Sequence, residues 1–308
     1  MQPGINTLLR ECLSINPLEK VLILTDNKIS KIGRKVYEAC RKINLESCLM
    51  VMEARTKEDE ELPMHVSNAM RASDVVIAIT SHSILYTKAT KIASEKGVRI
   101  ANLVRVSEKT FTKGGLTASY SRVSREVEKL FKKVDNSNFV EISSSNGTNV
   151  YFSTRERKWY KETGILRAPG KIGNLPGGEV YVAPVENSIN GKIVIDEFGE
   201  FGKKVSLEIE NGRIVKVSKA SKKFKELLEK YGEEFYICEF GIGCNYKVRF
   251  TGNIHEDKKV SGSIHFGFGY NLSFGGIINL PFHFDGIIKK ASVKVDNRII
   301  IERGKLII

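Results

Sequence analysis

Five residues whose side chains commonly bind metals occur in apolar, glycine-flanked segments of the second half of the chain: Glu179, Glu239, His265, His283 and Asp285. His283 and Asp285 are two residues apart in the predicted strand 277–288, and alternate residues of a strand share one face. Their imidazole and carboxylate are therefore expected to point into one space. Glu239 lies in an apolar segment that we expect to turn at two glycines, and a carboxylate buried there needs a cation because burial otherwise neutralises it.

Each of these signals also has a purely structural interpretation. The pair of His283 and Asp285 taken alone favours a hydrogen-bonded structural pair, and His265 taken alone favours a core histidine. Five such residues in one glycine-rich domain favour a shared metal centre instead, since buried charges are paired or bound to metal. Carboxylates and imidazoles without thiolates suit zinc, manganese, cobalt or iron(II). The five cysteines show no C-x-x-C spacing, so neither a four-cysteine zinc site nor a disulfide framework is expected.

The first half of the chain alternates apolar runs with helical periodicity, which is typical of an α/β fold with helices on both faces of a parallel sheet. The predicted strands are 21–25, 48–52, 74–80 and 98–104, and the predicted helices are 32–43, 64–70, 84–93 and 123–134. The turn after the first strand, 26–30, contains neither G-x-G-x-x-G nor a P-loop. We therefore expect a scaffold domain over residues 1–136 that binds no nucleotide cofactor.

The second half, residues 137–308, is predicted to be a mainly antiparallel β domain with a helix at 224–231. Asn211–Gly212 and Asp296–Asn297 occupy expected hairpin turns. The predicted strands are 139–143, 149–153, 180–183, 192–195, 205–209, 214–217, 246–250, 263–268, 277–282 and 292–295. This β-rich domain is expected to hold the metal and the catalytic residues.

The composition limits which binding partners and which cellular location we expect for the protein. The net charge is +13, but the basic excess is spread over both halves, which indicates solvated faces rather than a nucleic-acid groove. No apolar run approaches the roughly 20 residues that span a bilayer, and the amino terminus lacks a signal pattern. We expect a cytoplasmic protein that binds neither nucleic acid nor membrane. A lysine-rich composition with a single glutamine, Gln2, is typical of thermophiles.

Four motifs follow one another in the second half of the chain. They are Asn174-Leu-Pro-x-x-Glu179-Val with Ala183-Pro184, then Glu239-x-Gly-x-Gly-x-Asn245, Gly262-x-x-His265-x-x-x-Gly269 and His283-x-Asp285. In order and spacing they resemble the aminopeptidase T family of metallopeptidases, also called leucyl aminopeptidases. The resemblance spans both halves, because that family also places an α/β domain before a β-rich metal-binding domain. It implies a hydrolase that removes N-terminal amino acids from peptides.

The resemblance also implies a site. It assigns Glu179, Glu239, His265, His283 and Asp285 to a co-catalytic pair of zinc, cobalt or manganese ions, with Glu239 as the bridging carboxylate. Glu179 is then a catalytic carboxylate, and Glu186 is a second candidate for moving a proton, although a surface position is the simpler interpretation of Glu186. The family has a catalytic tyrosine seven residues after the first histidine. Here that position is Leu272, and we expect Tyr270 to replace the tyrosine.

Two other functions stay open. The same superfamily contains iron(II) enzymes of the 2,5-dihydroxypyridine dioxygenase kind, which use two histidines and an aspartate as ligands. His265, His283 and Asp285 satisfy that arrangement. The alternative is therefore a mononuclear ring-cleaving dioxygenase with a small-molecule substrate, and Glu239 separates the two readings because only a dinuclear hydrolase needs an acidic bridge. A third possibility is a non-catalytic metal-binding homologue, which the displaced tyrosine favours.

Self-association is expected through the β-rich half. The segments Gly262–Gly276 and Ser292–Ile308 offer apolar strand edges, and exposed edges invite pairing. The resembled family forms homodimers through this half. We therefore expect a symmetric homodimer.

Overall fold

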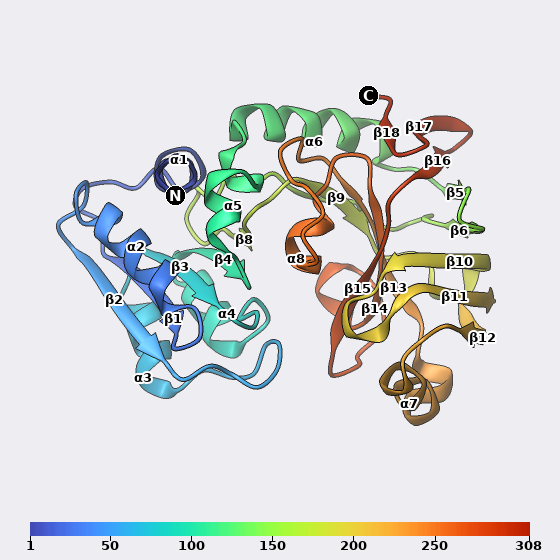
Figure 1. Ribbon diagram of the computed structural model, residues 1–308, viewed down its shortest axis with the longest axis horizontal. Helices are drawn as coiled ribbons and strands as arrows, with labels where there is room; N and C mark the ends of the chain where they lie inside the picture. Colours follow the sequence, from blue (N-terminus) through green and yellow to red (C-terminus); the bar gives the residue numbers. More distant parts are fainter. The chain divides into compact units, whose positions relative to one another are not determined.

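The computed structural model describes the backbone of residues 1–308 and every side chain except that of Glu233. The chain divides into two compact units (Figure 1). The first consists of Met1–Ser124, Glu162–Gly177 and Lys247–Arg249, and the second of Arg125–Lys161, Gly178–Tyr246 and Phe250–Ile308. Residues 162–177 and 247–249 thus pack with the first unit, although both segments follow the sequence-based boundary at residue 136.

A five-stranded parallel sheet in the order β2-β1-β3-β4-β8 forms the centre of the first unit. Its strands are β1 (Val21–Asp26), β2 (Ser47–Met52), β3 (Val75–Thr80), β4 (Arg99–Val104) and β8 (Ile172–Asn174). The first four agree with the predicted strands to within one residue at each end. Strands β1, β3 and β4 are buried along their whole length, as expected for a parallel sheet covered on both faces. The fifth strand, β8, was missed because three residues are too few to show a period.

Helices cover both faces of this sheet. Helix α2 (Ser30–Cys40) packs on one face, where Gly33 lies against Thr25 of β1. Helices α3 (Met64–Arg71) and α4 (Lys88–Glu95) pack on the other face over a core that includes Leu24 and Ala78. The remaining helices are α1 (Gln2–Asn6), α5 (Glu108–Thr112) and α6 (Tyr120–Val134), which crosses the boundary between the units. The predicted α/β architecture of the first half is confirmed.

The predicted helix 84–93 begins later than expected, at Lys88. The reason is an N-cap: Thr87 is extended, and its side chain accepts a hydrogen bond from the main-chain N–H of Thr90. The side chain of an N-cap residue accepts a hydrogen bond from one of the main-chain N–H groups that have no partner at the start of a helix. Residues 84–87 therefore form a turn before the helix.

An antiparallel sheet of 13 strands dominates the second unit. Its order is β18-β17-β16-β5-β6-β10-β15-β14-β13-β9-β7, and β11 and β12 extend from β10. The strands are β5 (Phe139–Ser144), β6 (Asn149–Ser153), β7 (Tyr160–Glu162), β9 (Glu179–Val182), β10 (Asn190–Glu197), β11 (Lys203–Glu210), β12 (Arg213–Ser218), β13 (Ile237–Gly243), β14 (Ile264–Gly269), β15 (His283–Ile288), β16 (Ala291–Val295), β17 (Arg298–Glu302) and β18 (Lys305–Leu306). Helices α7 (Lys222–Tyr231) and α8 (Ile254–Asp257) complete the unit. The predicted β-rich fold with a helix is confirmed.

Both predicted hairpin turns are present. Asn211 and Gly212 link β11 to β12, and Asp296 and Asn297 link β16 to β17. All four residues have positive φ, between 46° and 78°. Asn, Asp and Gly adopt this left-handed conformation most readily, which explains why the sequence signal was reliable.

Three local predictions in the second half are wrong. Residues 246–250 form no strand, and residues 277–282 are irregular. In the latter segment the side chain of Asn271 accepts the N–H of Ile278, and Pro281 has no N–H to offer a neighbouring strand. The apolar segment around Glu239 was expected to turn at its glycines, but β13 runs straight through Gly241 to Gly243.

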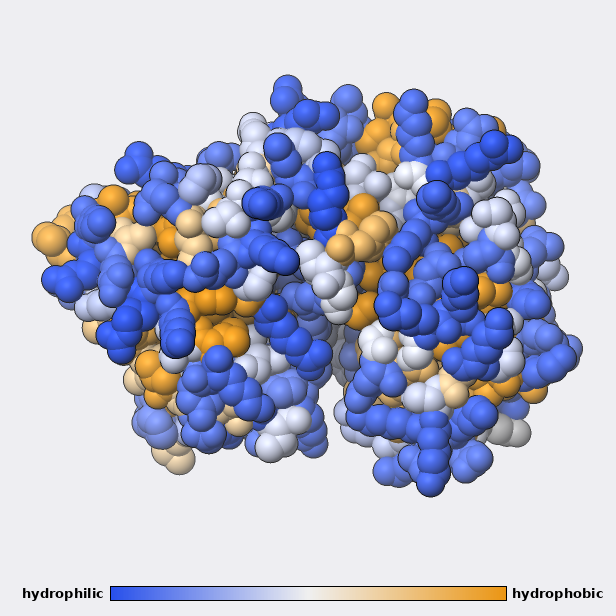
Figure 2. All heavy atoms as spheres, in the orientation of Figure 1, coloured by the Kyte–Doolittle hydropathy of each residue, from blue (hydrophilic) through white to orange (hydrophobic). Residues whose placement is uncertain are grey.

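Hydrophilic residues cover most of the face in Figure 2, with smaller hydrophobic areas between them. Among the described residues, no helix combines the length and the apolar character that crossing a bilayer requires.

Candidate metal centre

The potential metal ligands project from one face of four neighbouring strands. Strands β9, β13, β14 and β15 pair side by side in antiparallel register. Because strand residues alternate between faces, the opposite face carries the phenylalanines, which pack against one another. The ligand face carries Glu179, Glu239, His265, His283 and Asp285, and the other face carries Phe240, Phe266, Phe268 and Phe284. The sheet therefore brings together all five residues that the sequence singled out.

Two glycines make room for the histidine rings on this face. Gly241 pairs with His265, and a Cβ atom on Gly241 would lie 2.1 Å from Cε1 of the His265 ring. Gly267 lies between Glu239 and Asp285 in the sheet, and a Cβ atom there would lie 2.7 Å from Cβ of Glu239 and 3.0 Å from Cε1 of His283. Glycine is needed at these two positions because a Cβ atom would clash with the neighbouring side chains, and not because the backbone has a positive φ.

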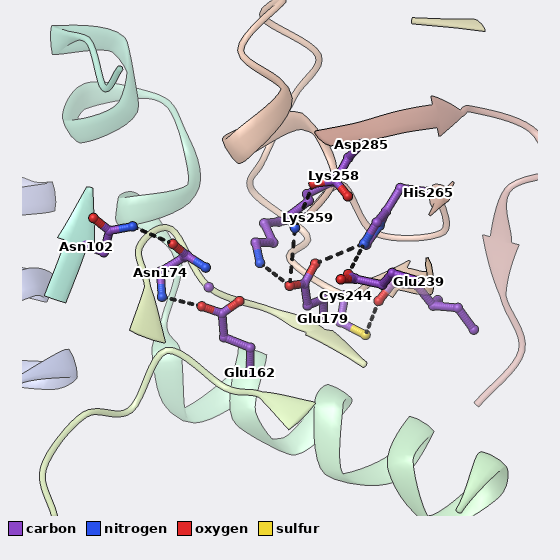
Figure 3. A network of polar contacts seen from close by, with 12 residues as sticks. Asn102, Glu162, Asn174, Glu179, Glu239, Cys244, Lys258, Lys259, His265 and Asp285 are labelled. Carbon is purple, nitrogen blue, oxygen red and sulfur yellow. Dashed lines mark hydrogen bonds and ion pairs between the residues drawn. The ribbon is translucent and has the colours of Figure 1, made fainter. Parts of the chain in front are cut away.

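Glu239 lies between the two histidines. Its Oε1 atom is 3.0 Å from Nε2 of His265, and its Oε2 atom is 3.3 Å from Nε2 of His283. Nε2 of His283 is also 3.3 Å from Oδ1 of Asp285. Figure 3 shows Glu239, His265 and Glu179 converging from neighbouring strands. One carboxylate thus connects two imidazoles.

Three of the five residues form a compact group of possible ligands. Glu239, His283 and Asp285 each offer one ligand atom, and these atoms all lie within 4.8 Å of one another. The side chain of His283 is 15% exposed, whereas those of Glu239 and Asp285 are 5% and 6% exposed. The group is therefore nearly buried but open at the histidine.

The main chain fixes the orientation of His283. Its Nδ1 atom is 2.9 Å from the carbonyl oxygen of Tyr270, and a carbonyl can only accept, so Nδ1 carries the hydrogen. In the neutral imidazole this leaves Nε2 with a lone pair directed toward Glu239 and Asp285. Metal-binding histidines almost always donate their other N–H group in this way. Burial opposes protonation of His283, but contacts with Cys238 and the two carboxylates raise its pKa well above the ordinary value, so a metal ion at Nε2 would take the place of a proton.

His265 and Glu179 are arranged differently. His265 is fully buried, its Nε2 atom contacts Glu239, and its Nδ1 atom has no hydrogen-bond partner. Oε2 of Glu179 is 3.7 Å from Nε2 of His265 and also has no hydrogen-bond partner. His265 therefore lacks the N–H contact that orients His283, and the sequence-based triad of two histidines and Asp285 is less compact than the group that contains Glu239.

Two lysines that the sequence did not predict at this site, Lys258 and Lys259, follow α8. Nζ of Lys258 is 3.0 Å from Oδ2 of Asp285 and 3.9 Å from Oε1 of Glu179. Nζ of Lys259 forms an ion pair with Oε1 of Glu179 (Figure 3), and this side chain is fully buried. Adjacent lysines in a sequence usually lie on solvated faces, so only the buried carboxylates nearby gave any signal.

The lysines determine the charge of the site. Burial opposes ionisation of Glu239, but the positive charge of Lys258 and the contacts with His265 and His283 outweigh burial and lower the pKa of that carboxyl. Burial likewise opposes ionisation of Asp285, and Lys258 together with His283 holds its pKa well below the ordinary value. The pKa of Lys258 is raised well above its ordinary value, because the carboxylates overcome the effect of burial. The carboxylates are therefore ionised and available as ligands.

Two further candidates lie near the ligands. Tyr270 follows β14, and its carbonyl oxygen is 2.9 Å from Nδ1 of His283; a catalytic role for its hydroxyl stays a prediction. Glu186 is buried and forms an ion pair with Arg157, while its second oxygen accepts the N–H of Ile277 at 2.9 Å. Arg157 also donates to the carbonyl oxygen of Gly275. Glu186 therefore anchors the loop before β15, and the interpretation as a surface residue is wrong because the ion pair buries it.

The residues fit a divalent cation. Oδ1 of Asp285 and Oε2 of Glu179 are buried oxygens without hydrogen-bond partners, and both face the histidines. A buried carboxylate oxygen is costly unless it is paired or bound to metal. The donors are carboxylates and one oriented imidazole, which suit iron(II), manganese or zinc. Glu239, His283 and Asp285 are therefore the candidate ligands.

Comparisons with known proteins show which folds and which family the chain resembles. No curated protein matches the chain. The fold is similar to that of the 2,5-dihydroxypyridine dioxygenase from Pseudomonas putida KT2440, with 18% identity, a TM-score of 0.79, and coverage of 99% of this chain and 96% of that one. It is also similar to wild-type AmpT from Thermus thermophilus, with 14% identity, a TM-score of 0.70, and coverage of 100% and 99%. The resemblance to aminopeptidase T thus holds for the fold.

The family model with the description 2,5-dihydroxypyridine 5,6-dioxygenase matches residues 6–308, which is nearly the whole chain and includes all five potential ligands. The chain therefore belongs to the NicX, or 2,5-dihydroxypyridine 5,6-dioxygenase, family.

Proposed function

We propose that this protein is a single-metal dioxygenase that opens a dihydroxylated aromatic ring, with iron(II) held by Glu239, His283 and Asp285. The observation that carries the proposal is the compact group of these three residues, whose ligand atoms lie within 4.8 Å of one another. Membership of the 2,5-dihydroxypyridine 5,6-dioxygenase family supports both the reaction and the class of substrate.

A bound iron(II) ion supplies the redox chemistry that lets dioxygen react with an electron-rich ring. The chain supplies the ligands and their orientation. The carbonyl of Tyr270 holds the ring of His283, and Lys258 contacts Oδ2 of Asp285 at 3.0 Å, which would leave Oδ1, beside His283, to bind the ion. Such outer contacts keep ligands in place and tune the site.

Aromatic side chains border His283, the most exposed of the three proposed ligands. The rings of Phe274 and His283 are 6.1 Å apart between centroids, and Tyr181 packs against Phe274 at 5.7 Å. Tyr160 stacks on Tyr181 at 5.5 Å. A flat aromatic substrate suits such surroundings, because aromatic rings attract one another in edge-to-face and offset arrangements.

Oxygen consumption tests the proposal directly. Protein reconstituted anaerobically with iron(II) is mixed with air-saturated buffer and 2,5-dihydroxypyridine, and oxygen uptake and loss of ring absorbance are followed. Asp285→Asn should abolish uptake because it removes a charged ligand. Asp257→Asn is the matched control, since Asp257 is an equally buried carboxyl that bonds to Thr251 and Gly252 instead.

Oxygen uptake by the wild-type protein and the two variants distinguishes the dioxygenase from the other candidate functions. We expect uptake with the wild-type protein and with Asp257→Asn. Iron-loaded wild-type protein that consumes no oxygen with dihydroxylated pyridines or benzenes would refute the dioxygenase and leave a hydrolase or a non-catalytic metal-binding protein.

A metal-dependent aminopeptidase is the second candidate, and one observation favours it. The two oxygens of Glu239 face different histidines, at 3.0 Å and 3.3 Å, as they would in a carboxylate that bridges two ions. Two bridged ions supply an acidified water for peptide hydrolysis. Amino-acid p-nitroanilides with cobalt or zinc test this function, and equal rates for the wild-type protein and Glu239→Gln would exclude it.

A further inference from the structure

Two buried ammonium groups lie beside Glu179, one of the five potential metal ligands. Lys259 is fully buried, and its Nζ atom pairs with Oε1 of Glu179. Lys258 is 10% exposed and reaches both Asp285 and Glu179. Lysine is almost never fully buried unless it is paired, so these positions are specific features of the site.

Main-chain contacts position Lys258 and Lys259 beside Glu179. Gly243 pairs with Glu179 across β13 and β9, and a Cβ atom on Gly243 would lie 2.7 Å from the carbonyl oxygen of Lys258 and 2.3 Å from that of Val260. The N–H of Asn245 donates to the carbonyl oxygen of Lys259 at 2.8 Å. The lysine segment is therefore held against the strand directly beside Glu179.

The lysines occupy only one side of each carboxylate. On Glu179 they contact Oε1, while Oε2 faces His265 at 3.7 Å. Together Glu179, His265 and Oε1 of Glu239 form the second half of the site that a two-metal hydrolase would require. An ion placed there would share Glu179 with an ammonium group, and like charges in a buried site repel strongly.

We propose that Lys259, assisted by Lys258, takes the place of a second metal ion and restricts the centre to one ion. When both imidazoles are neutral, as ligands must be, three carboxylates and two ammonium groups leave one negative charge in the site. One divalent ion reverses this to a single positive charge, whereas two ions would leave three positive charges in a buried space. The inference rests on the proposed single-metal function and explains how one chain keeps five potential ligands and binds one ion.

Metal stoichiometry tests the inference without an activity assay. Manganese(II) is titrated calorimetrically into metal-free protein, and the bound ion is counted by elemental analysis after gel filtration. The wild-type protein should bind one ion per chain. Lys259→Met should bind a second ion, and adding Glu179→Gln to that variant should return the count to one, because Glu179 would be a ligand of the second ion.

The controls keep the outcome interpretable. Lys289→Met removes a lysine that pairs with Glu197 at 2.9 Å and should leave one ion per chain. If Lys259→Met fails to fold, Lys259→Gln is the second variant: it removes the same charge, keeps a hydrogen-bond donor opposite Glu179, and should also bind a second ion.

Two results would overturn the inference. One is two tightly bound ions in the wild-type protein, and the other is a single ion in a folded Lys259→Met variant. Failure of the proposed dioxygenase function would appear separately, as one bound iron without oxygen uptake.

Discussion

Replacing Gly267 by alanine should weaken metal binding far more than it weakens the fold. A Cβ atom at this position would lie 2.7 Å from Cβ of Glu239 and 3.0 Å from the His283 ring, whereas ordinary contact begins at 3.4 Å. Two of the three proposed ligands must therefore move by about 0.4 to 0.7 Å. Overpacking of this kind costs about 1–3 kcal/mol of stability. Displacing groups that orient ligands typically costs about 10- to 100-fold in metal affinity.

Gly286→Ala is a closely matched control on the neighbouring strand. Its Cβ atom would lie 2.8 Å from side-chain atoms of Ile195 and 3.0 Å from Phe198, on the apolar face of the sheet. The two variants should lose similar stability in urea unfolding. Only Gly267→Ala should lose affinity in a calorimetric metal titration. Equal metal affinity in the two variants would refute the assignment of Glu239 and His283 as ligands.

Three further outcomes follow from the structure, and a fourth rests on the sequence alone. Iodoacetamide should label the native protein at Cys48 alone, because the other four cysteines are buried. Detection of a second labelled cysteine by mass spectrometry would show that this cysteine is not buried. Glu186→Gln should cost about 3 kcal/mol in urea unfolding, because it leaves Arg157 without its buried partner; an unchanged midpoint would show that the pair contributes little. Burial raises the pKa of Asp257 above its ordinary value of 3.8, so the folded protein keeps this proton to a higher pH than the unfolded chain does. The stability relative to Asp257→Asn should therefore be greatest below pH 3.8 and fall as the pH rises. Unfolding curves with no such trend would argue against the raised pKa. We also propose a homodimer, and light scattering that gives the 34.5 kDa mass of one chain throughout a dilution series would exclude it.

Local patterns in the sequence determined much of the fold. The strands β1 to β4 are mainly apolar, and the turns at Asn211–Gly212 and Asp296–Asn297 use residues that tolerate positive φ, so both could be predicted. The five potential ligands were also identifiable, because charged residues in apolar, glycine-flanked segments are rare without a partner. The three-residue strand β8 and the irregular segment 277–282 could not be predicted, since their structure depends on distant partners.

Only the tertiary structure decided how the site is organised. Periodicity places Glu239 and His265 on strands, but the register across β13, β14 and β15 groups Glu239 with His283 and Asp285. The role of the Tyr270 carbonyl depends on the loop that follows β14, because a main-chain contact leaves no trace in residue types. Lys258 and Lys259 look like solvated residues in the sequence, and they enter the centre because the chain after α8 packs against Gly243. Ligand types are a local property of the sequence, whereas the number of ions depends on which charges the fold brings together.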